Sequence, residues 1–143
     1  MQEKLRKLLL RHEGMRLSPY QDSLGNLTIG VGWALEKNPM RESEALFRLN
    51  NDLEYFLEQL EFKYDWFVKL NDVRKSVIVN MSFNLGLKGF ASFRKMIKLI
   101  EDEKYQLAAV EMLDSRWALQ VGKRADELSE MLATGRWLNE LAN

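Results

Sequence analysis

Three side chains near the N-terminus carry groups that can transfer or hold a proton. Glu13 stands at the end of a helix predicted over residues 2–12, Asp22 lies in a segment rich in turn formers, and Thr28 follows six residues later. The partial negative charge of a helix C-terminus disfavours a carboxylate at Glu13, which suits a group that must bring a proton to a substrate. Taken singly, the three residues are also an ordinary solvated glutamate, turn aspartate and strand threonine.

A dense pattern contains all three residues. It consists of Glu13-Gly14, then Tyr20-Gln21-Asp22-Ser23 with Gly25, then Thr28-Ile29-Gly30-Val31-Gly32. Here the sequence resembles the phage-type lysozyme family, glycoside hydrolase family 24. The chain keeps every spacing of the family's E-x8-D-x5-T motif, and a match of this length is far more specific than a lone short motif.

The resemblance continues through the second half of the chain. Residues 80–86 (NMSFNLG) are similar to the family's N-M-x-F-x-x-G segment. Further likenesses are Ser115-Arg116-Trp117, the GKRA run at 122–125, and Trp137 after a Thr-Gly-Arg run. The resemblance therefore covers nearly the whole sequence.

The resemblance implies a muramidase, which hydrolyses the β-1,4 bond between N-acetylmuramic acid and N-acetylglucosamine in peptidoglycan. Glu13 would be the general acid that protonates the leaving oxygen. Asp22 and Thr28 would hold the attacking water on the opposite face of the sugar, so that the reaction inverts the anomeric carbon. Inverting enzymes keep their two carboxyl groups about 6.5–9.5 Å apart, and nine residues of chain allow that separation.

The same resemblance implies three substrate-binding residues: Ala34, Phe83 and Arg124. Arg124 matches an arginine that family members pair with the catalytic glutamate, although a surface arginine is the alternative. Phe83 matches a phenylalanine that lines the cleft, and a plain core aromatic fits the sequence equally well. Ala34 falls where the family contacts substrate through the backbone.

The elements that must position these residues predict an α+β fold. Turn formers separate two predicted strands, 17–20 and 27–33. Asn38 and Pro39 mark the expected start of a long helix. Further helices are predicted over residues 64–69, 72–85, 92–102, 105–113 and 123–134, with a last turn at 137–141.

We therefore expect one lysozyme-like domain, 1–143, with two lobes. A small β-hairpin lobe covers about 14–38, and a connecting helix covers about 39–61. The larger helical lobe covers about 62–143 and also takes in helix 2–12, because that helix precedes the hairpin. The active-site cleft is expected between the lobes.

Composition excludes several classes of protein. The chain has 143 residues, with 21 Lys and Arg against 21 Asp and Glu, one His and no Cys. The lack of Cys excludes disulfides and thiolate metal sites, and a single His argues against a His-rich zinc site. A net charge of zero argues against a general nucleic-acid binder. Neither a cofactor nor a metal is expected.

The N-terminal segment resembles no targeting sequence. Its apolar run, Leu8–Leu10, is much shorter than the roughly 7–15 apolar residues of a signal peptide. No uncharged run approaches the roughly 18 residues of a membrane span. We therefore expect no signal peptide, no signal anchor and no stable membrane insertion, so that the chain stays in the host cytoplasm until it is released to the periplasm and cell wall.

The resemblance also implies partners and a biological role. The partner would be the glycan strands of peptidoglycan, cut by a monomeric enzyme during host-cell lysis. A holin or another export route would be needed to cross the inner membrane.

The sequence departs from its family in one region. Trp33 stands where close relatives have a histidine, and it either offers an aromatic face to a sugar or covers the hairpin. The chain between Trp33 and Leu46 is shorter than in the T-even members of the family, so a small helix of the β-rich lobe is expected to be missing and the cleft to be more open.

Two other functions remain open from the sequence. A lytic transglycosylase on the same fold needs the acid but no attacking water, so the presence of Asp22 and Thr28 counts against it. A non-catalytic lysozyme-like binding module tolerates loss of the acid, and Glu13 is present in its full setting.

Overall fold

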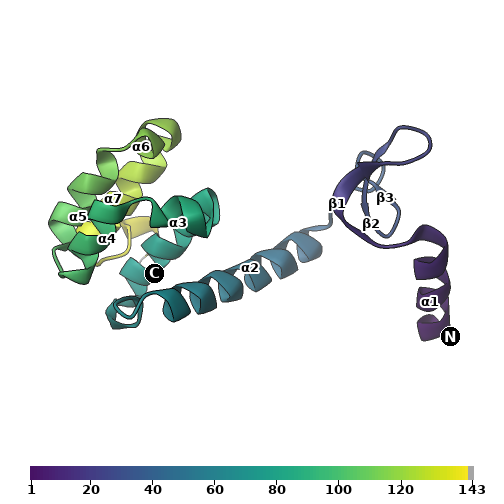
Figure 1. The fold of residues 1–143 in the computed structure, drawn as a ribbon, viewed down its shortest axis with the longest axis horizontal. Helices are drawn as coiled ribbons and strands as arrows, with labels where there is room; N and C mark the ends of the chain where they lie inside the picture. The colour runs from purple at the N-terminus through teal and green to yellow at the C-terminus, as the bar shows by residue number, and fades with distance from the viewer. Residues whose placement is uncertain (142–143) are drawn as a thin grey trace. The chain divides into compact units, whose positions relative to one another are not determined.

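The computed structural model describes residues 1–141 and divides the chain into two compact units (Figure 1). The first unit is Met1–Phe47, and the second begins at Arg48. Helix α2 (Glu42–Lys63) begins in the first unit and continues into the second. The prediction that helix 2–12 belongs to the helical lobe stays a prediction, because the two units are defined separately.

The first unit contains one helix and a small antiparallel sheet. Helix α1 (Gln2–Glu13) ends at Gly14, whose N–H still bonds to the carbonyl of Leu10 and whose positive φ of 72° takes the chain out of the helix. The sheet follows, with strands in the order β1-β2-β3. The strands are β1 (Arg16–Gln21), β2 (Leu27–Gly30) and β3 (Trp33–Ala34).

The prediction of one strand over residues 27–33 is wrong. The chain reverses after Gly30, and residues 33–34 return as β3, which pairs antiparallel with β2. Gly30 and Gly32 have φ values of 67° and 68°, a left-handed conformation that β-branched residues rarely adopt. Two glycines spaced by one residue therefore make a turn where the Thr-Ile-Val composition indicated a continuous strand.

The predicted start of the long helix is also wrong. Asn38 does not cap it, since its side chain donates to the carbonyl of Ala34, and the helix begins only at Glu42. The backbone N–H of Arg41 donates to the Glu44 carboxylate at 2.8 Å, which is one half of a capping box. No helix lies between β3 and α2, as expected from the short segment there.

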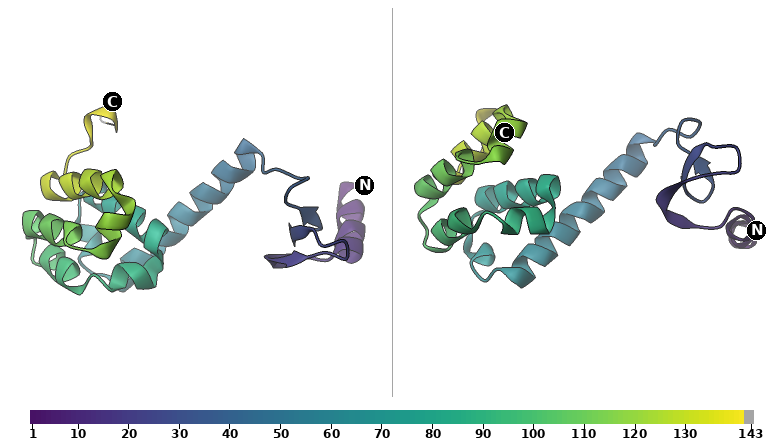
Figure 2. Two further views of the ribbon diagram at one scale, coloured as in Figure 1. Left: turned by 90° about the horizontal axis from the view of Figure 1, so that it is seen from above. Right: turned by 45° about the horizontal axis from the view of Figure 1, so that its top comes forward.

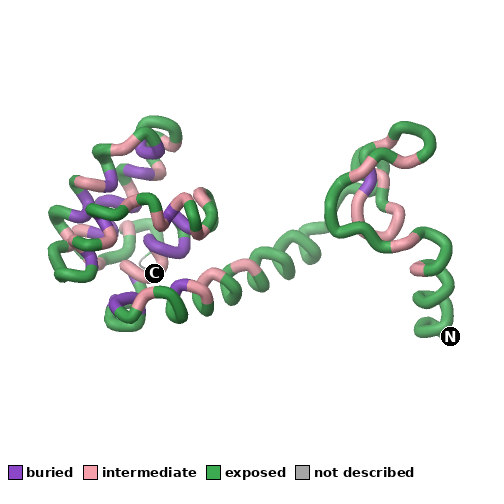
Figure 3. Tube along the Cα trace, in the orientation of Figure 1, coloured by how far each residue is buried: buried purple, intermediate pink, exposed green. Residues whose placement is uncertain are grey.

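The second unit is helical and holds the apolar core (Figures 2 and 3). After α2 come η1 (Phe67–Lys69), α3 (Asp72–Ala91), α4 (Arg94–Glu101), α5 (Tyr105–Leu113), α6 (Arg116–Val121), α7 (Lys123–Thr134) and η2 (Asn139–Leu141). Helix α5 packs against α4 and α7, and α3 also packs against α7. The largest fully buried side chains of the described residues are Phe67, Phe90, Leu60, Ile78 and Met81. Within residues 1–141, no helix has the length and apolar character that a membrane span requires.

The structure confirms the α+β class, and two helices have their predicted bounds, 105–113 and 123–134. The predicted helix 64–69 is only a 3-10 turn, and α6 was not predicted. Gly86, expected to end a helix, has a φ of 76° and interrupts α3, after which the helix resumes. The expected helix over residues 92–102 begins later, at Arg94.

Arg74 joins three elements of the second unit. From α3, its Nε donates to the carbonyl of Leu132 at 2.8 Å and its Nη2 to that of Ala133 at 3.1 Å, so it caps the end of α7. Its guanidinium also lies 3.8 Å from the ring centroid of Tyr105 on α5. The positively charged guanidinium therefore donates hydrogen bonds to carbonyl groups that have no partner within the last turn of α7.

We expect Arg74→Leu to lower the free energy of unfolding by about 1.5–3 kcal/mol, because two hydrogen bonds from a charged donor are lost. Urea unfolding followed by tryptophan fluorescence measures the change. Arg94→Leu is the matched control, since Arg94 is exposed and its side chain makes no hydrogen bond within the described residues. Equal effects of the two substitutions would contradict the role of Arg74.

Candidate active site

Glu13 is the last residue of α1, and its carboxyl group lies against the backbone of Gly32. A Cβ atom added to Gly32 would collide with Oε2 of Glu13 and would lie 3.0 Å from its carboxyl carbon. Glycine at position 32 therefore provides the space that the Glu13 carboxyl occupies. The Glu13 side chain is otherwise exposed.

Asp22 lies in the turn between β1 and β2, and its carboxylate closes that turn. Oδ1 accepts the backbone N–H groups of Leu24 at 2.9 Å and Asn26 at 2.8 Å. Oδ2 accepts the side-chain amide of Asn26 at 3.1 Å. The backbone and then the side chain of Asn26, followed by the Leu24 N–H and the Lys37 charge, lower the pKa of Asp22 below its ordinary 3.8. Asp22 is thus a carboxylate, not an acid, near neutral pH.

Thr28 is the one buried residue among residues 1–47, with 2% of its surface exposed. Its hydroxyl donates to the backbone carbonyl of Asn26 at 2.9 Å. Across the sheet it pairs with Tyr20 on one side and Ala34 on the other, so these three side chains share one face. The structure therefore brings Asp22 and Thr28 together through Asn26, and places Ala34 beside Thr28.

Trp33 lies on the opposite face of the sheet from Thr28, paired with Ile29. Its ring covers the α-carbon of Gly30, where an added Cβ would collide with the ring. Trp33 remains 54% exposed and borders a pocket of about 520 Å³. That pocket is lined by Ile29, Trp33, Leu35, Lys37, Asn38, Pro39, Met40, Arg41 and Glu44.

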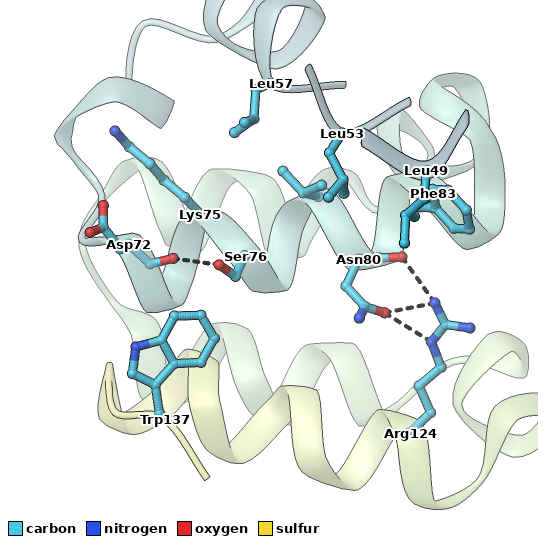
Figure 4. Close-up of a pocket in the computed structure, with 11 residues that line it drawn as sticks. Leu49, Leu53, Leu57, Asp72, Lys75, Ser76, Asn80, Phe83, Arg124 and Trp137 are labelled. Atoms are coloured by element: carbon cyan, nitrogen blue, oxygen red, sulfur yellow. Dashed lines mark hydrogen bonds between the residues drawn. The ribbon is translucent and has the colours of Figure 1, made fainter. Parts of the chain in front are cut away.

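Phe83 and Arg124 come together in the second unit, at a pocket of about 600 Å³ (Figure 4). Leu49, Leu53 and Leu57 of α2 form one apolar wall of this pocket, and Trp137 and Val79 also line it. Phe83 is 45% exposed, with its ring centroid 5.9 Å from that of Phe56. Its exposure distinguishes it from a plain core aromatic.

Arg124 is held by Asn80, a residue that the sequence analysis did not single out for this contact. Its Nε and Nη2 donate to Oδ1 of Asn80 at 2.9 and 2.7 Å, and Nη2 also reaches the Asn80 carbonyl at 3.3 Å. Figure 4 shows these bonds from α7 to α3. The expected pairing of Arg124 with Glu13 stays a prediction, because the two residues belong to different units.

The phage lysozyme family model matches residues 10–131. The chain belongs to the phage lysozyme family. Membership makes it a glycoside hydrolase with lysozyme activity, whose substrate is peptidoglycan. All six residues assigned from the sequence lie inside the matched range: Glu13, Asp22, Thr28, Ala34, Phe83 and Arg124.

Individual relatives agree with the family. The chain is 30% identical to "Probable T4-type lysozyme 2" of Dictyostelium discoideum, over 94% of this chain and 96% of that protein. It is 28% identical to "Probable T4-type lysozyme 1" of the same organism, with the same coverage. A third similarity, at 25% identity over 90% of this chain, covers 27% of the pre-baseplate central spike protein of Enterobacteria phage T4.

Sequence reasoning missed two contacts of this lysozyme's first unit. Asn26 was classed only as a turn former; a turn aspartate signals a bond to the backbone two residues on, which is the Leu24 contact, but not the further contacts with Asn26. The contact of Gly32 with Glu13 has no such signal, because spacing along the chain does not show which glycine a distant carboxyl approaches. Within residues 1–141, no cluster of three His, Cys, Asp or Glu residues has the arrangement of a metal site.

We expect Gly32→Ala to displace the Glu13 carboxyl with its new methyl group. If Glu13 is the general acid that the family resemblance implies, kcat should fall on the order of a hundredfold, the effect of a small misplacement of a catalytic group. Gly86→Ala is the control, since Gly86 also has a positive φ but nothing within 4 Å of an added Cβ. Each substitution costs about 1–2 kcal/mol of stability through left-handed backbone strain. Turbidity assays on cell walls measure the activity of both variants, and each rate is divided by the folded fraction of the enzyme. An equal loss of activity in the two variants would contradict a role of Gly32 in placing Glu13.

We expect the Asp22 carboxyl to titrate below 3.8 in the folded enzyme. The lowered pKa means that its hydrogen bonds stabilise the fold above the ordinary value and that this contribution is lost as pH falls through the folded pKa. Carbon-13 NMR of the Asp22 carboxyl measures the midpoint. Lys37→Met should raise it only slightly, because the Lys37 charge is the smallest of the favourable causes. A midpoint at or above 3.8 in the unaltered enzyme would show that these bonds do not persist in solution.

Proposed function

We propose that this lysozyme is an inverting muramidase in which Glu13 is the general acid and Asp22 and Thr28 hold the attacking water. The observation that carries the proposal is the contrast between two carboxyl groups of one unit. Asp22 accepts three hydrogen bonds that favour its charged form, whereas Glu13 is exposed at a helix end against Gly32. Glycoside cleavage with inversion requires one group that gives a proton to the leaving oxygen and one carboxylate that holds the water, and the proposal assigns these roles to Glu13 and Asp22.

The reaction breaks the bond between C1 of N-acetylmuramic acid and the oxygen of N-acetylglucosamine. Glu13 gives its proton to the leaving oxygen while the oxygen of a water molecule bonds to C1 from the opposite face. Asp22 accepts a proton of that water and passes it to solvent, and solvent returns a proton to Glu13. For this geometry the two carboxyl groups must stand about 6.5–9.5 Å apart, which leaves room for the water.

The substrate-binding roles of Ala34, Phe83 and Arg124 belong to the same proposal. Ala34 is half-buried beside Thr28 and would contact, through its backbone N–H, the sugar next to the bond that breaks. Its carbonyl already accepts hydrogen bonds from Lys37 and Asn38. Phe83 presents an exposed ring, a surface on which sugar rings commonly pack. Arg124 is hydrogen-bonded to Asn80 and would bind an anionic or carbonyl group of the glycan.

We propose that the biological role is lysis of a host bacterium, supported by membership of a phage family. The enzyme would act as a monomer on glycan strands and would reach them through a holin or another export route. One domain that includes both units, with its active-site cleft between the lobes, remains part of this proposal.

Mass spectrometry of muropeptides tests the reaction. Purified peptidoglycan digested by the unaltered enzyme is expected to yield reducing muramic ends. Glu13→Gln should lose about 10²–10⁴ of the rate, the usual contribution of a general acid. Glu3→Gln is the matched control, because Glu3 is on the same helix and makes only an exposed ion pair with Lys7.

The other outcomes each assign a different function. Anhydro-muramic ends would identify a lytic transglycosylase and remove the water from the mechanism. No cleavage by the unaltered enzyme would leave only a binding module. Proton NMR of fresh product adds the stereochemistry, since inversion releases the α-anomer and a β-anomer would exclude the roles given to Asp22 and Thr28.

A further inference from the structure

Asn26 is bonded to both of the groups proposed to hold the attacking water. Its backbone N–H and its side-chain amide donate to the two different oxygens of Asp22, at 2.8 and 3.1 Å. Its backbone carbonyl accepts the N–H of Asp22 and the hydroxyl of Thr28, both at 2.9 Å. A single residue thus connects the turn that carries Asp22 with the strand that carries Thr28.

These bonds determine which acceptor sites remain free on Asp22. A carboxylate has about four acceptor positions, two on each oxygen. Oδ1 uses both of its positions on the backbone N–H groups of Leu24 and Asn26, whereas Oδ2 uses one on the Asn26 amide. One acceptor position therefore remains, and it is on Oδ2.

The Thr28 hydroxyl also has a fixed role as hydrogen-bond donor. A carbonyl oxygen can only accept, so Thr28 must donate its single proton to Asn26. Towards any other partner Thr28 can then act only as an acceptor. With 2% of its surface exposed, Thr28 is closed to a sugar ring, and a further partner has to be as small as water.

We propose that Asn26 is a positioning residue that orients the nucleophilic water of this lysozyme. The inference rests on the proposed roles of Asp22 and Thr28. One proton of the water is accepted by Oδ2 of Asp22 and the other by Oγ1 of Thr28, so that a lone pair of the water oxygen is left to attack C1. When the bond to C1 forms, the proton on the Asp22 side moves to Oδ2, and the proton from Glu13 moves to the leaving oxygen.

The amide of Asn26 is suited to this role because it is neutral. The amide fills one acceptor position of Oδ2 of Asp22. Because it carries no charge, it leaves the second acceptor position of Oδ2 to the water. Replacement by Asp would put a second carboxylate against Asp22, which raises the pKa of Asp22. Lys37 is the charged residue that lowers the pKa of Asp22, and it does so through its charge without a hydrogen bond.

Kinetics of Asn26→Ala and Asn26→Asp test the inference. Asn26→Ala keeps the backbone bonds and loses only the amide, so we expect kcat to fall about tenfold with little change in KM, as for a contact that acts in the transition state. The acid limb of the kcat profile should move to higher pH in Asn26→Ala and further in Asn26→Asp. Ser23→Ala, in the same turn, is the control, because the Ser23 side chain makes no hydrogen bond within residues 1–141.

A second pair of variants examines the hydroxyl. Thr28→Ser keeps an acceptor that can donate to Asn26 and should retain most of kcat, whereas Thr28→Val keeps the shape and loses the acceptor, so its kcat should fall. All rates are scaled to the folded fraction from circular dichroism. Asn26→Asp and Thr28→Val keep the shape of the native side chains, and the scaling to the folded fraction removes any effect on stability from the comparison.

The outcomes separate this inference from the proposed function. If Asp22→Asn is inactive but Asn26→Ala has an unaltered kcat and pH profile, Asn26 does not orient the water while the proposed mechanism stands. If Asp22→Asn keeps full activity, the proposed mechanism itself fails. A loss in Asn26→Ala that arises only through KM or the folded fraction also overturns the positioning role.

Discussion

The turn between β2 and β3 is the constraint on which the proposed catalytic groups of this lysozyme depend. Two glycines with positive φ reverse the chain, and each leaves free the space that a Cβ would occupy. The Glu13 carboxyl fills that space at Gly32, and the Trp33 ring fills it at Gly30. The same backbone feature therefore closes the sheet, receives the carboxyl at the end of α1 and directs Trp33 away from the face that carries Thr28.

The second half of the constraint is the turn before β2, which Asp22 closes with its own side chain. Here the carboxylate is at once a structural acceptor and the proposed base, and the two roles share its four acceptor positions. The structural bonds lower the pKa of Asp22, so the same contacts that shape the turn keep the group charged. Structure and chemistry are therefore difficult to separate at Asp22, whereas Glu13 forms no comparable network.

Sequence reasoning succeeded where local chemistry decides the structure. Helices 105–113 and 123–134 were located to the residue; Gly122 and Gly135 flank the second. It failed at residues 27–33, where β-branched composition favoured one strand and paired glycines made a turn. Helix α6 was missed because its six residues give too short a pattern, although Ser115 caps it.

The candidate site divides in the same way. The motif selected Glu13, Asp22 and Thr28, because these residues keep fixed spacings along the chain. The contacts of Asn26, Gly32 and Asn80 depend on how the backbone folds, and spacing alone does not reveal them. The family match shows the lysozyme activity, whereas the roles proposed for individual residues are argued from hydrogen bonds that only the three-dimensional structure contains.

The two units differ in how many of their side chains are buried, and this difference affects how each unit responds to substitutions. By itself, the unit of residues 1–47 has no apolar core, since its one buried residue is a threonine, whereas the second unit contains the large buried side chains. Within this unit, Trp33 and Leu35 are partly exposed, and the close contact of the Trp33 ring is with the backbone of Gly30. The groups proposed to perform the chemistry are thus held by glycine turns and hydrogen bonds and not by apolar packing, so the loss of one glycine or one bond disturbs them more than a change of side-chain volume on the outer face.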